Sequence, residues 1–328
     1  MRKQRFLQRF GNLDSAHVNH APIKQVGRWS AERLSRIRSS RDYSECVPNV
    51  EPDLAFLQHN RSEPSVTWIG HSTFLIQLSG LNIVTDPVWA RRMAFQKRLS
   101  PPGIELSDMP AADVVLISHS HYDHLHMSSL RRLRGDKKLL VPAGLRSKLF
   151  LRGFKDTVEL HWWEDERCGG VTFSFVPAQH WTRRNPWDKN LSHWGGWVMQ
   201  PDSGPTIYFA GDSGYFRGFG DIGRRFKIDV ALMPIGAYDP EWFMSAQHVS
   251  PEEALRAFLD LKAKYFVPMH YGSFKLADDT PKEALDRLEA ARDRMNIPED
   301  RLFLLQHGET MRFHKGNDDN EAKDGSDS

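Results

Sequence analysis

The chain has 328 residues and a formal net charge of +2, from 44 Lys and Arg against 42 Asp and Glu. With 40% hydrophobic and 26% charged residues it has the composition of a globular protein with a substantial core, which excludes collagen-like, coiled-coil and wholly disordered chains. A mean hydropathy of −0.55 without a long apolar run predicts no transmembrane helix, and the near-zero charge predicts no nucleic-acid partner.

The two ends of the chain differ in charge. Residues 1–42 contain ten Lys or Arg and three acidic residues, whereas residues 316–328 contain five acidic residues and one Lys. The acidic end has too little apolar surface to order itself, and no linker or internal repeat divides the chain between the two ends. We therefore predict a basic N-terminal arm over residues 1–60 packed on or near the domain, one domain over residues 61–315 and a disordered tail over residues 316–328.

Short apolar or β-branched runs that stop at polar residues fill the middle of the chain. Such runs are typical of buried strands. They predict strands over residues 73–78, 81–85, 113–118, 138–141, 157–162, 171–176, 197–200, 206–210, 229–234, 265–269 and 302–305.

Two helices are marked by the residues at their starts. Ser250-Pro251-Glu252-Glu253 combines a capping serine, a proline at the first helical position and a glutamate three residues after the cap, and Thr280-Pro281-Lys282-Glu283 repeats this pattern. Further helices are expected after His124 and Ala143. Many strands with helices after them, in two halves of the chain, indicate packed sheets covered by helices.

A histidine-rich motif follows directly on the predicted strand 113–118. It reads His119-Ser120-His121-Tyr122-Asp123-His124, and in extended backbone His119 and His121 point the same way. Asp123 and His124 fall where the chain turns into a helix and can face a second point nearby. Imidazole and carboxylate are the usual ligands of zinc and related divalent ions, so the motif predicts a metal site. A solvated histidine-rich turn is the alternative.

Three further candidate ligands stand just after predicted strands. They are His180, Asp212 and His270. Each alone would more often be a capping or surface residue. Together they repeat one pattern, a strand followed by a ligand, which is typical of loops gathered at one edge of a sheet sandwich.

The motif His-x-His-x-Asp-His, followed in order by His180, Asp212 and His270, resembles the metallo-β-lactamase superfamily. The resemblance implies an α/β (α+β) fold, an αββα sandwich of two mixed β-sheets flanked by helices. A narrower resemblance, to the N-acyl phosphatidylethanolamine phospholipase D branch, rests on residues 68–73, 85–87, 177–181, 210–215, 234–238, 247–249 and 269–272.

The superfamily pattern assigns the ligands position by position. It places one metal ion on His119, His121 and His180, a second on Asp123, His124 and His270, and Asp212 between the two. The resemblance implies two divalent ions per chain, with zinc first and manganese or iron also compatible. It further implies that the ions share a water that attacks as hydroxide, which Asp123 can orient.

Three residues outside this ligand set are also implicated by the resemblance. Asp86 is expected to hold the loops of the site, although an aspartate before Pro87 is also a common turn residue. His71 fits equally a support of the metal ligands and a local structural role. His248 lies where relatives carry a histidine near the substrate phosphate, so it is a candidate to bind the phosphate or protonate the leaving group. Packing at the start of the following helix is the alternative.

Candidate substrate contacts come from two segments. Trp242-Phe243-Met244 places three adjacent large apolar residues in a polar loop, which predicts an acyl-chain groove or a contact with a bilayer. Arg183 and Arg184 follow His180, and we expect them, Arg183 in particular, to attract an anionic phosphate. The alternative for such charge runs is a solvated face.

Taken as a member of this branch, the chain is expected to be a binuclear metal-dependent hydrolase. The resemblance implies a phosphodiesterase of the phospholipase D type, which converts N-acyl phosphatidylethanolamine-like lipids into an N-acylethanolamine and a phosphatidic acid. A lactonase of phosphorylated sugar acids, a nuclease of the same superfamily and a non-enzymatic metal-bearing scaffold are the alternatives. The expected partner is a phospholipid or another small phosphodiester, and the sequence is compatible with a homodimer.

The start of the chain bears on its location. No apolar stretch follows its first cations, and two cysteines, Cys46 and Cys168, suit a reducing compartment, so we expect a cytoplasmic protein without a signal peptide. The same start alternates cations and apolar residues, which predicts peripheral contact with the anionic inner face of a membrane. The residues are Arg2, Lys3, Arg5, Phe6, Leu7, Arg9 and Phe10. A solvated arm that wraps the domain is the alternative.

Overall fold

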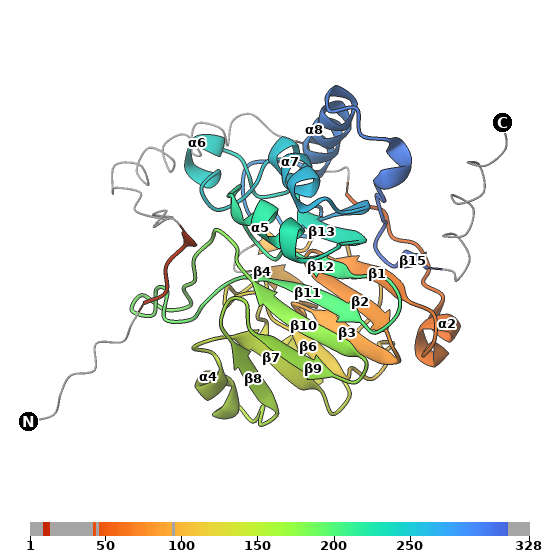
Figure 1. Ribbon diagram of the computed structural model, residues 1–328, viewed down its shortest axis with the longest axis vertical. Helices are drawn as coiled ribbons and strands as arrows, with labels where there is room; N and C mark the ends of the chain where they lie inside the picture. Colours follow the sequence, from red (N-terminus) through yellow and green to blue (C-terminus); the bar gives the residue numbers. More distant parts are fainter. Residues whose placement is uncertain (1–8, 14–41, 44–45, 94–95, 314–328) are drawn as a thin grey trace, which may run out of the picture.

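The computed structural model describes residues 9–13, 42–43, 46–93 and 96–313. Two large mixed β-sheets form the middle of the molecule (Figure 1). The first sheet has seven strands, in the order β15 (Thr310–Arg312), β1 (Ser65–Gly70), β2 (Thr73–Leu78), β3 (Leu81–Thr85), β6 (Val114–Leu116), β7 (Lys138–Pro142) and β8 (Thr157–Leu160). The second has six, in the order β14 (Tyr265–Met269), β13 (Val230–Pro234), β12 (Ile207–Phe209), β11 (Gly196–Pro201), β10 (Val171–Val176) and β9 (Asp165–Cys168).

Each sheet changes from antiparallel to parallel pairing partway across. In the first sheet, β1, β2 and β3 pair antiparallel, and β3, β6, β7 and β8 pair parallel. In the second sheet, β9 to β12 pair antiparallel and β12, β13 and β14 pair parallel. Because parallel strands finish at the same edge, the residues after several strands of both sheets gather on one side of the sandwich.

The central core lies between the two sheets. Val66, Phe74 and Leu140 of the first sheet share one buried cluster with Phe173 and Leu232 of the second. Side chains alternate across a strand, so the intervening residues of the first sheet form a second buried cluster on its outer face. That cluster is covered by α2 (Leu54–His59), α3 (Met127–Arg132) and α4 (Arg146–Phe150).

Helices also cover the second sheet. α7 (Pro251–Leu261) packs on β13, and α5 (Gly218–Arg225) and α8 (Pro281–Arg294) pack on α7 (Figure 1). The start of α7 is the predicted capping box: Ser250 accepts from the backbone N–H of Glu253, whose carboxylate accepts from the N–H of Ser250. The expected αββα sandwich is confirmed, as are the two capped helices and the helices after His124 and Ala143.

One predicted strand is wrong and several real ones were not predicted. Residues 302–305 make a single bridge, from Leu302 to Phe266, because the backbone turns back where the N–H of Leu305 donates to the carbonyl of Phe303. The strands missed by sequence reasoning are β1, β9, β15 and the short hairpin of β4 (Arg92–Met93) and β5 (Gln96–Lys97). The residues before the capped α7, expected as a loop, form the short helix α6 (Glu241–Met244).

Most of the residues for which we made predictions at the two ends of the chain lie outside the part that the structure describes. The acidic tail over residues 316–328 lies outside the described residues, as do Arg2, Lys3, Arg5, Phe6 and Leu7 of the predicted membrane contact. Among the described residues, no helix has the length and apolar character needed to cross a membrane.

Candidate metal centre

The predicted ligands gather at one edge of the sandwich. The motif follows β6, Asp86 follows β3, His180 follows β10, Asp212 follows β12 and His270 follows β14. These strands all finish at this edge, so the two sheets contribute ligands to a shared site.

The first cluster of donor atoms consists of three imidazoles. Nε2 of His119 lies 2.9 Å from Nδ1 of His121, which lies 3.2 Å from Nε2 of His180. His119 and His180 are buried, and His121 is partly exposed toward the cavity described below. Their ring nitrogens lie close enough together to hold one metal ion.

The second cluster combines imidazole and carboxylate. Nε2 of His124 lies 3.2 Å from Nε2 of His270, and Oδ2 of Asp123 lies 3.4 Å and 3.6 Å from these two atoms. Nε2 of His71 is 3.2 Å from the same Asp123 oxygen. This group can also hold a metal ion.

Asp212 lies between the two clusters. Its Oδ2 is 3.2 Å from Nε2 of His124 and 3.8 Å from Nε2 of both His119 and His180. Its Oδ1 is 3.1 Å from Nε2 of His270. Asp212 is therefore the residue whose carboxylate reaches both clusters.

Hydrogen bonds on the outer side of the site orient the imidazoles. Nδ1 of His180 donates to the carbonyl of Gln247 at 2.9 Å, and Nδ1 of His124 donates to Oδ2 of Asp86 at 2.7 Å. The hydroxyl of Ser118 donates to Asp86, so its oxygen accepts from Nδ1 of His119 at 2.9 Å. With a proton on the outer nitrogen, the neutral His119 and His180 rings present the lone pair of the inner Nε2 to the site, and His124 does so when its inner nitrogen has lost its proton.

This arrangement fits bound cations. In the first cluster, Nε2 of His119 and Nε2 of His180 both turn lone pairs toward Nδ1 of His121, and a cation among the three rings would satisfy all three nitrogens. The buried Oδ1 of Asp212 lies 3.1 Å from Nε2 of His270, itself a candidate ligand atom, so both atoms face the same point of the site. All donors are nitrogen or oxygen, and neither cysteine takes part, which suits zinc, manganese or iron.

The two clusters differ in their protonation. Burial and the neighbouring imidazoles lower the pKa of His119 well below its ordinary value, and burial lowers the pKa of His121 to about 4. Burial also acts on His124 and His270, but Asp212 and Asp123 outweigh it and raise the pKa of His270 to about 9. The first cluster is therefore neutral by itself, and the second takes up protons when no cation is bound.

Asp86 contacts a candidate ligand directly. Its buried carboxylate accepts from Nδ1 of His124, from the hydroxyl of Ser118 at 2.5 Å and from the backbone N–H of Ser118 at 2.7 Å. Asp86, His71 and His270 all have positive φ, of 30°, 57° and 63°, a backbone conformation that costs energy for non-glycine residues. Such strain persists where the surroundings fix the conformation, as at this edge of the sandwich.

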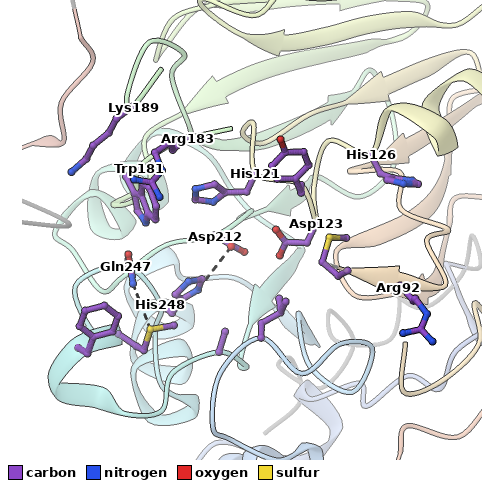
Figure 2. Close-up of a pocket in the computed structure, with 16 residues that line it drawn as sticks. Arg92, His121, Asp123, His126, Trp181, Arg183, Lys189, Asp212, Gln247 and His248 are labelled. Carbon is purple, nitrogen blue, oxygen red and sulfur yellow. Dashed lines mark hydrogen bonds and ion pairs between the residues drawn. The ribbon is translucent and has the colours of Figure 1, made fainter. Parts of the chain in front are cut away.

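A cavity of about 990 Å³ opens onto the metal centre (Figure 2). Figure 2 shows Trp181, Arg183 and Lys189 on one side of Asp212, and His126 and Arg92 on the other. The apolar wall of the cavity includes Met93, Phe243, Met244 and Leu276. The predicted contacts Arg183, Phe243, Met244 and His248 line this cavity, whereas Trp242 is not among its lining residues and is 40% exposed.

His248 faces the metal centre from the floor of the cavity. Its Nδ1 lies 3.9 Å from Oδ2 of Asp212 (Figure 2), and among the described residues it has no hydrogen-bond partner. Burial lowers the pKa of His248 to about 4, so the ring is neutral at pH 7. A neutral imidazole with a free nitrogen beside the site can bind or exchange a proton with a substrate.

Arg184 differs from its expected role as a cation at the mouth. Its guanidinium donates to the carbonyls of Ser120 at 2.7 Å and Leu125 at 2.9 Å, and it lies 4.1 Å from the ring of Tyr122. It thus fastens the histidine motif to the loop after His180. Sequence reasoning missed this because a side chain that binds backbone carbonyls leaves no pattern of spacing.

His126 was also missed as a cavity residue. Its Nδ1 accepts from the backbone N–H of Ser129 at 3.3 Å and lies 2.7 Å from the Ser129 hydroxyl, which itself accepts from the N–H of Trp89. The ring proton is therefore on Nε2. His126 could have been found from its position, because it stands two residues after the motif and at the start of the expected helix.

Comparison with known proteins agrees with this geometry. Residues 81–271 match the beta-lactamase superfamily domain. An N-acyl-phosphatidylethanolamine-hydrolyzing phospholipase D of Caenorhabditis elegans is 35% identical over 287 residues, which cover 80% of this chain and 80% of that protein. A UPF0173 metal-dependent hydrolase of Myxococcus xanthus is 30% identical over 247 residues, 72% of this chain and 81% of that protein.

A solved structure shares the fold. The structure of Igni18, a metallo hydrolase from the archaeon Ignicoccus hospitalis, is 26% identical, with a TM-score of 0.60, and covers 77% of this chain and 99% of that chain. The family match covers more than half of the sequence and includes the histidine motif. These similarities confirm the resemblance seen in the motifs: the chain belongs to the metallo-β-lactamase superfamily and is a metal-dependent hydrolase.

Proposed function

We propose that the chain binds two divalent cations, one at each donor cluster, with Asp212 shared between them. Nitrogen-rich donor sets favour zinc, and the same donors accept manganese or iron. Two such ions, when bound, supply Lewis-acid polarisation of a phosphoryl oxygen and activation of a water. Metal analysis of the purified protein tests this directly, with two ions per chain as the expected result.

The proposed reaction is phosphodiester hydrolysis of an N-acyl phosphatidylethanolamine-like lipid. The observation that carries it is the cavity, which sets the cations Arg92, Arg183 and Lys189 and the apolar Phe243 and Met244 beside one metal centre. A substrate with an anionic headgroup and long acyl chains matches both features. The similarity to the Caenorhabditis elegans phospholipase D supports the same substrate class.

The chemistry balances as a simple hydrolysis. The oxygen of water forms a new bond to phosphorus, and the bond between phosphorus and the ethanolamine oxygen breaks. One proton of the water ends on the departing ethanolamine oxygen, and the products are a phosphatidic acid and an N-acylethanolamine. His248, whose Nδ1 lies 3.9 Å from Asp212 and has no hydrogen-bond partner within residues 9–13, 42–43, 46–93 and 96–313, is the group assigned to bind the phosphate or pass that proton.

An isotope experiment tests the substrate and the bond that breaks. The metal-loaded protein is incubated with N-acyl phosphatidylethanolamine in mixed micelles made in H₂¹⁸O, and both products are weighed by mass spectrometry. The expected result is one ¹⁸O in the phosphatidic acid and none in the N-acylethanolamine. Label in the N-acylethanolamine would overturn the assigned bond.

A panel of other substrates separates the alternatives. Turnover of lactones of phosphorylated sugar acids without phosphodiester hydrolysis would favour the lactonase, and cleavage of RNA would favour the nuclease. No metal-dependent turnover of any ester would leave a metal-bearing scaffold. Each of these outcomes contradicts the phospholipase D proposal.

A lipid substrate also requires access to a membrane. We extend the proposal to peripheral binding through Arg2, Lys3, Arg5, Phe6 and Leu7, since Arg9 and Phe10 contact the loop that follows β10. The Trp242-Phe243-Met244 segment, of which Trp242 is 40% exposed, would add an apolar contact. Each Lys or Arg near an anionic surface contributes about 1 kcal/mol, so binding should be weak and sensitive to salt. Sedimentation with anionic vesicles at low and high salt tests this. No binding at low salt would contradict it.

A further inference from the structure

A short N-terminal segment, far from the ligands in sequence, lies against the loop that follows β10. We call residues 9–13 the N-terminal strap. Its backbone N–H at Phe10 donates to the carbonyl of Asn190 at 2.9 Å, and the Phe10 ring stacks on His193 with centroids 4.4 Å apart. Leu13 packs against the central core. The strap is drawn in dark red beside the loop in Figure 1.

One side chain of the strap binds the backbone of a metal ligand. Oδ1 of Asn12 accepts from the N–H of His180 at 3.0 Å, and its Nδ2 donates to the carbonyl of His180 at 3.1 Å. The same Oδ1 also accepts from the indole N–H of Trp194 at 2.9 Å. The Asn12 carboxamide therefore holds both polar groups of the His180 peptide backbone and ties them to a buried tryptophan.

His180 needs such support because its own segment is irregular. Residues 177–181 form neither helix nor strand, apart from one bridge between Gln179 and Gly214. The ring of His180 is fixed through Nδ1 by Gln247, and its backbone is fixed by Asn12. Ligand atoms must be held to within about half an ångström, and outer contacts of this kind supply that precision.

The strap also holds the next part of the same loop. The guanidinium of Arg9 donates to the carbonyl of Lys189, and Lys189 lines the cavity together with Trp181. The strap thus contacts both the loop that supplies a ligand and the loop that forms one wall of the substrate cavity.

We infer that the N-terminal strap helps the metal centre to bind its ion, and that Asn12 is the positioning residue for His180. It acts through the His180 backbone and sets how well the first cluster, His119, His121 and His180, holds its ion. The inference rests on the metal centre of the proposed function and not on its lipid substrate.

The test uses the full chain with Co²⁺ as the probe. Asn12→Ala removes the carboxamide, and we expect its affinity for one of two Co²⁺ ions to fall about 10-fold or more, with a changed visible absorption for that ion. The other ion should bind as in the wild type. The matched control is Asn49→Ala, which loses a hydrogen bond from Nδ2 to the carbonyl of Pro101, a contact that involves no candidate ligand, and should leave both ions unchanged.

A second variant separates positioning from stability. Asn12→Asp keeps an acceptor for the N–H groups of His180 and Trp194 but places an oxygen against the His180 carbonyl, so it should also alter the Co²⁺ spectrum. If Asn12→Ala does not fold, this variant decides. Wild-type Co²⁺ affinity and spectrum in the variant that folds, whatever its thermal stability, would overturn the inference.

The metal readout also separates this inference from the proposed reaction. A chain that binds Co²⁺ as expected but hydrolyses no phosphodiester contradicts the proposed substrate and leaves the role of Asn12 intact. A chain that hydrolyses the lipid while Asn12→Ala binds Co²⁺ normally contradicts the role of Asn12 alone.

Discussion

The two donor clusters are built from similar residues but are supported in opposite ways. In the first, His119 and His180 donate outward to neutral oxygens, those of Ser118 and Gln247. In the second, His124 donates to the carboxylate of Asp86, and Asp123 lies among the ligands themselves. Carboxylates draw positive charge of any kind, so the second cluster attracts protons and cations alike, whereas the first remains neutral. We therefore expect the first cluster to release its ion more easily.

Removing the group that both clusters share should have the largest effect. We expect Asp212→Ala to abolish turnover and to lower metal content while leaving the fold largely intact, because Asp212 lies within 3.8 Å of ligand atoms in both clusters. Metal content and initial rates measure this. Near wild-type activity at full metal content would refute the bridging role.

His248 lies beside both clusters without belonging to either proposed ligand set. His248→Ala should lower turnover by about 10²–10⁴-fold, the usual range for acid–base groups, and leave both ions in place. The comparison of kcat with metal stoichiometry checks this. Loss of an ion in parallel with activity would make His248 a ligand, an option that its position beside His180 and Asp212 allows.

A substitution of Asp86 compares metal binding at the two clusters, because Asp86 contacts a ligand of the second cluster directly. Asp86→Ala should weaken binding of the ion of the second cluster by about 10–100-fold, because Asp86 accepts directly from Nδ1 of His124. Binding at the first cluster should weaken less, because Asp86 reaches His119 only through the Ser118 hydroxyl. Competition with a chelator, followed for each ion, provides the measurement. The matched control is Asp229→Ala, whose carboxylate accepts from the N–H of Thr206 just before β12 and β13, at the edge of the sheet opposite the ligands. Equal weakening of both ions would contradict the comparison.

The pH dependence of metal affinity gives the smallest and most specific contrast. Without metal, the pKa of His270 is about 9, so this ring is protonated at pH 7 and must lose its proton when the ion binds. Affinity at the second cluster should therefore rise by up to about tenfold per pH unit between pH 7 and 9.

The first cluster supplies the reference for this measurement. The pKa of His121 is about 4, so the ring is already neutral across that range and affinity there should stay nearly flat. Titration calorimetry in buffers of different ionisation enthalpy counts the released protons. If close to zero protons are released for both ions, the carboxylates do not keep the histidines of the second cluster protonated in the absence of metal.

The sequence predicted that the candidate ligands come together, because each one follows a buried strand. His180, Asp212 and His270 stand after runs of apolar residues, and parallel strands bring such positions to one edge. The wrong strand at residues 302–305 has the same apolar character, but its residues form no ladder: Leu302, Phe303 and Leu305 pack on the core. Composition alone does not separate these two cases.

The supports of the ligands could not be predicted in the same way. Asn12 and Arg184 bind backbone groups of distant residues, and many polar side chains could do so. Gln247 supports His180 through its own backbone carbonyl, which any residue could supply. Asp86 was predicted only because a family resemblance marked it. These contacts depend on which distant residues the fold brings together, and not on the spacing of residues along the sequence.

The strap has a consequence for how the protein is made. Asn12 lies 168 positions before His180 and 182 before Trp194, so it leaves the ribosome long before its partners exist. At about 5–20 residues per second, the wait is roughly 10–35 s. During synthesis the strap therefore waits until β1, β2, β3 and β6 to β8 of the first sheet, and β9 and β10 of the second, have emerged before it can secure the loop of His180.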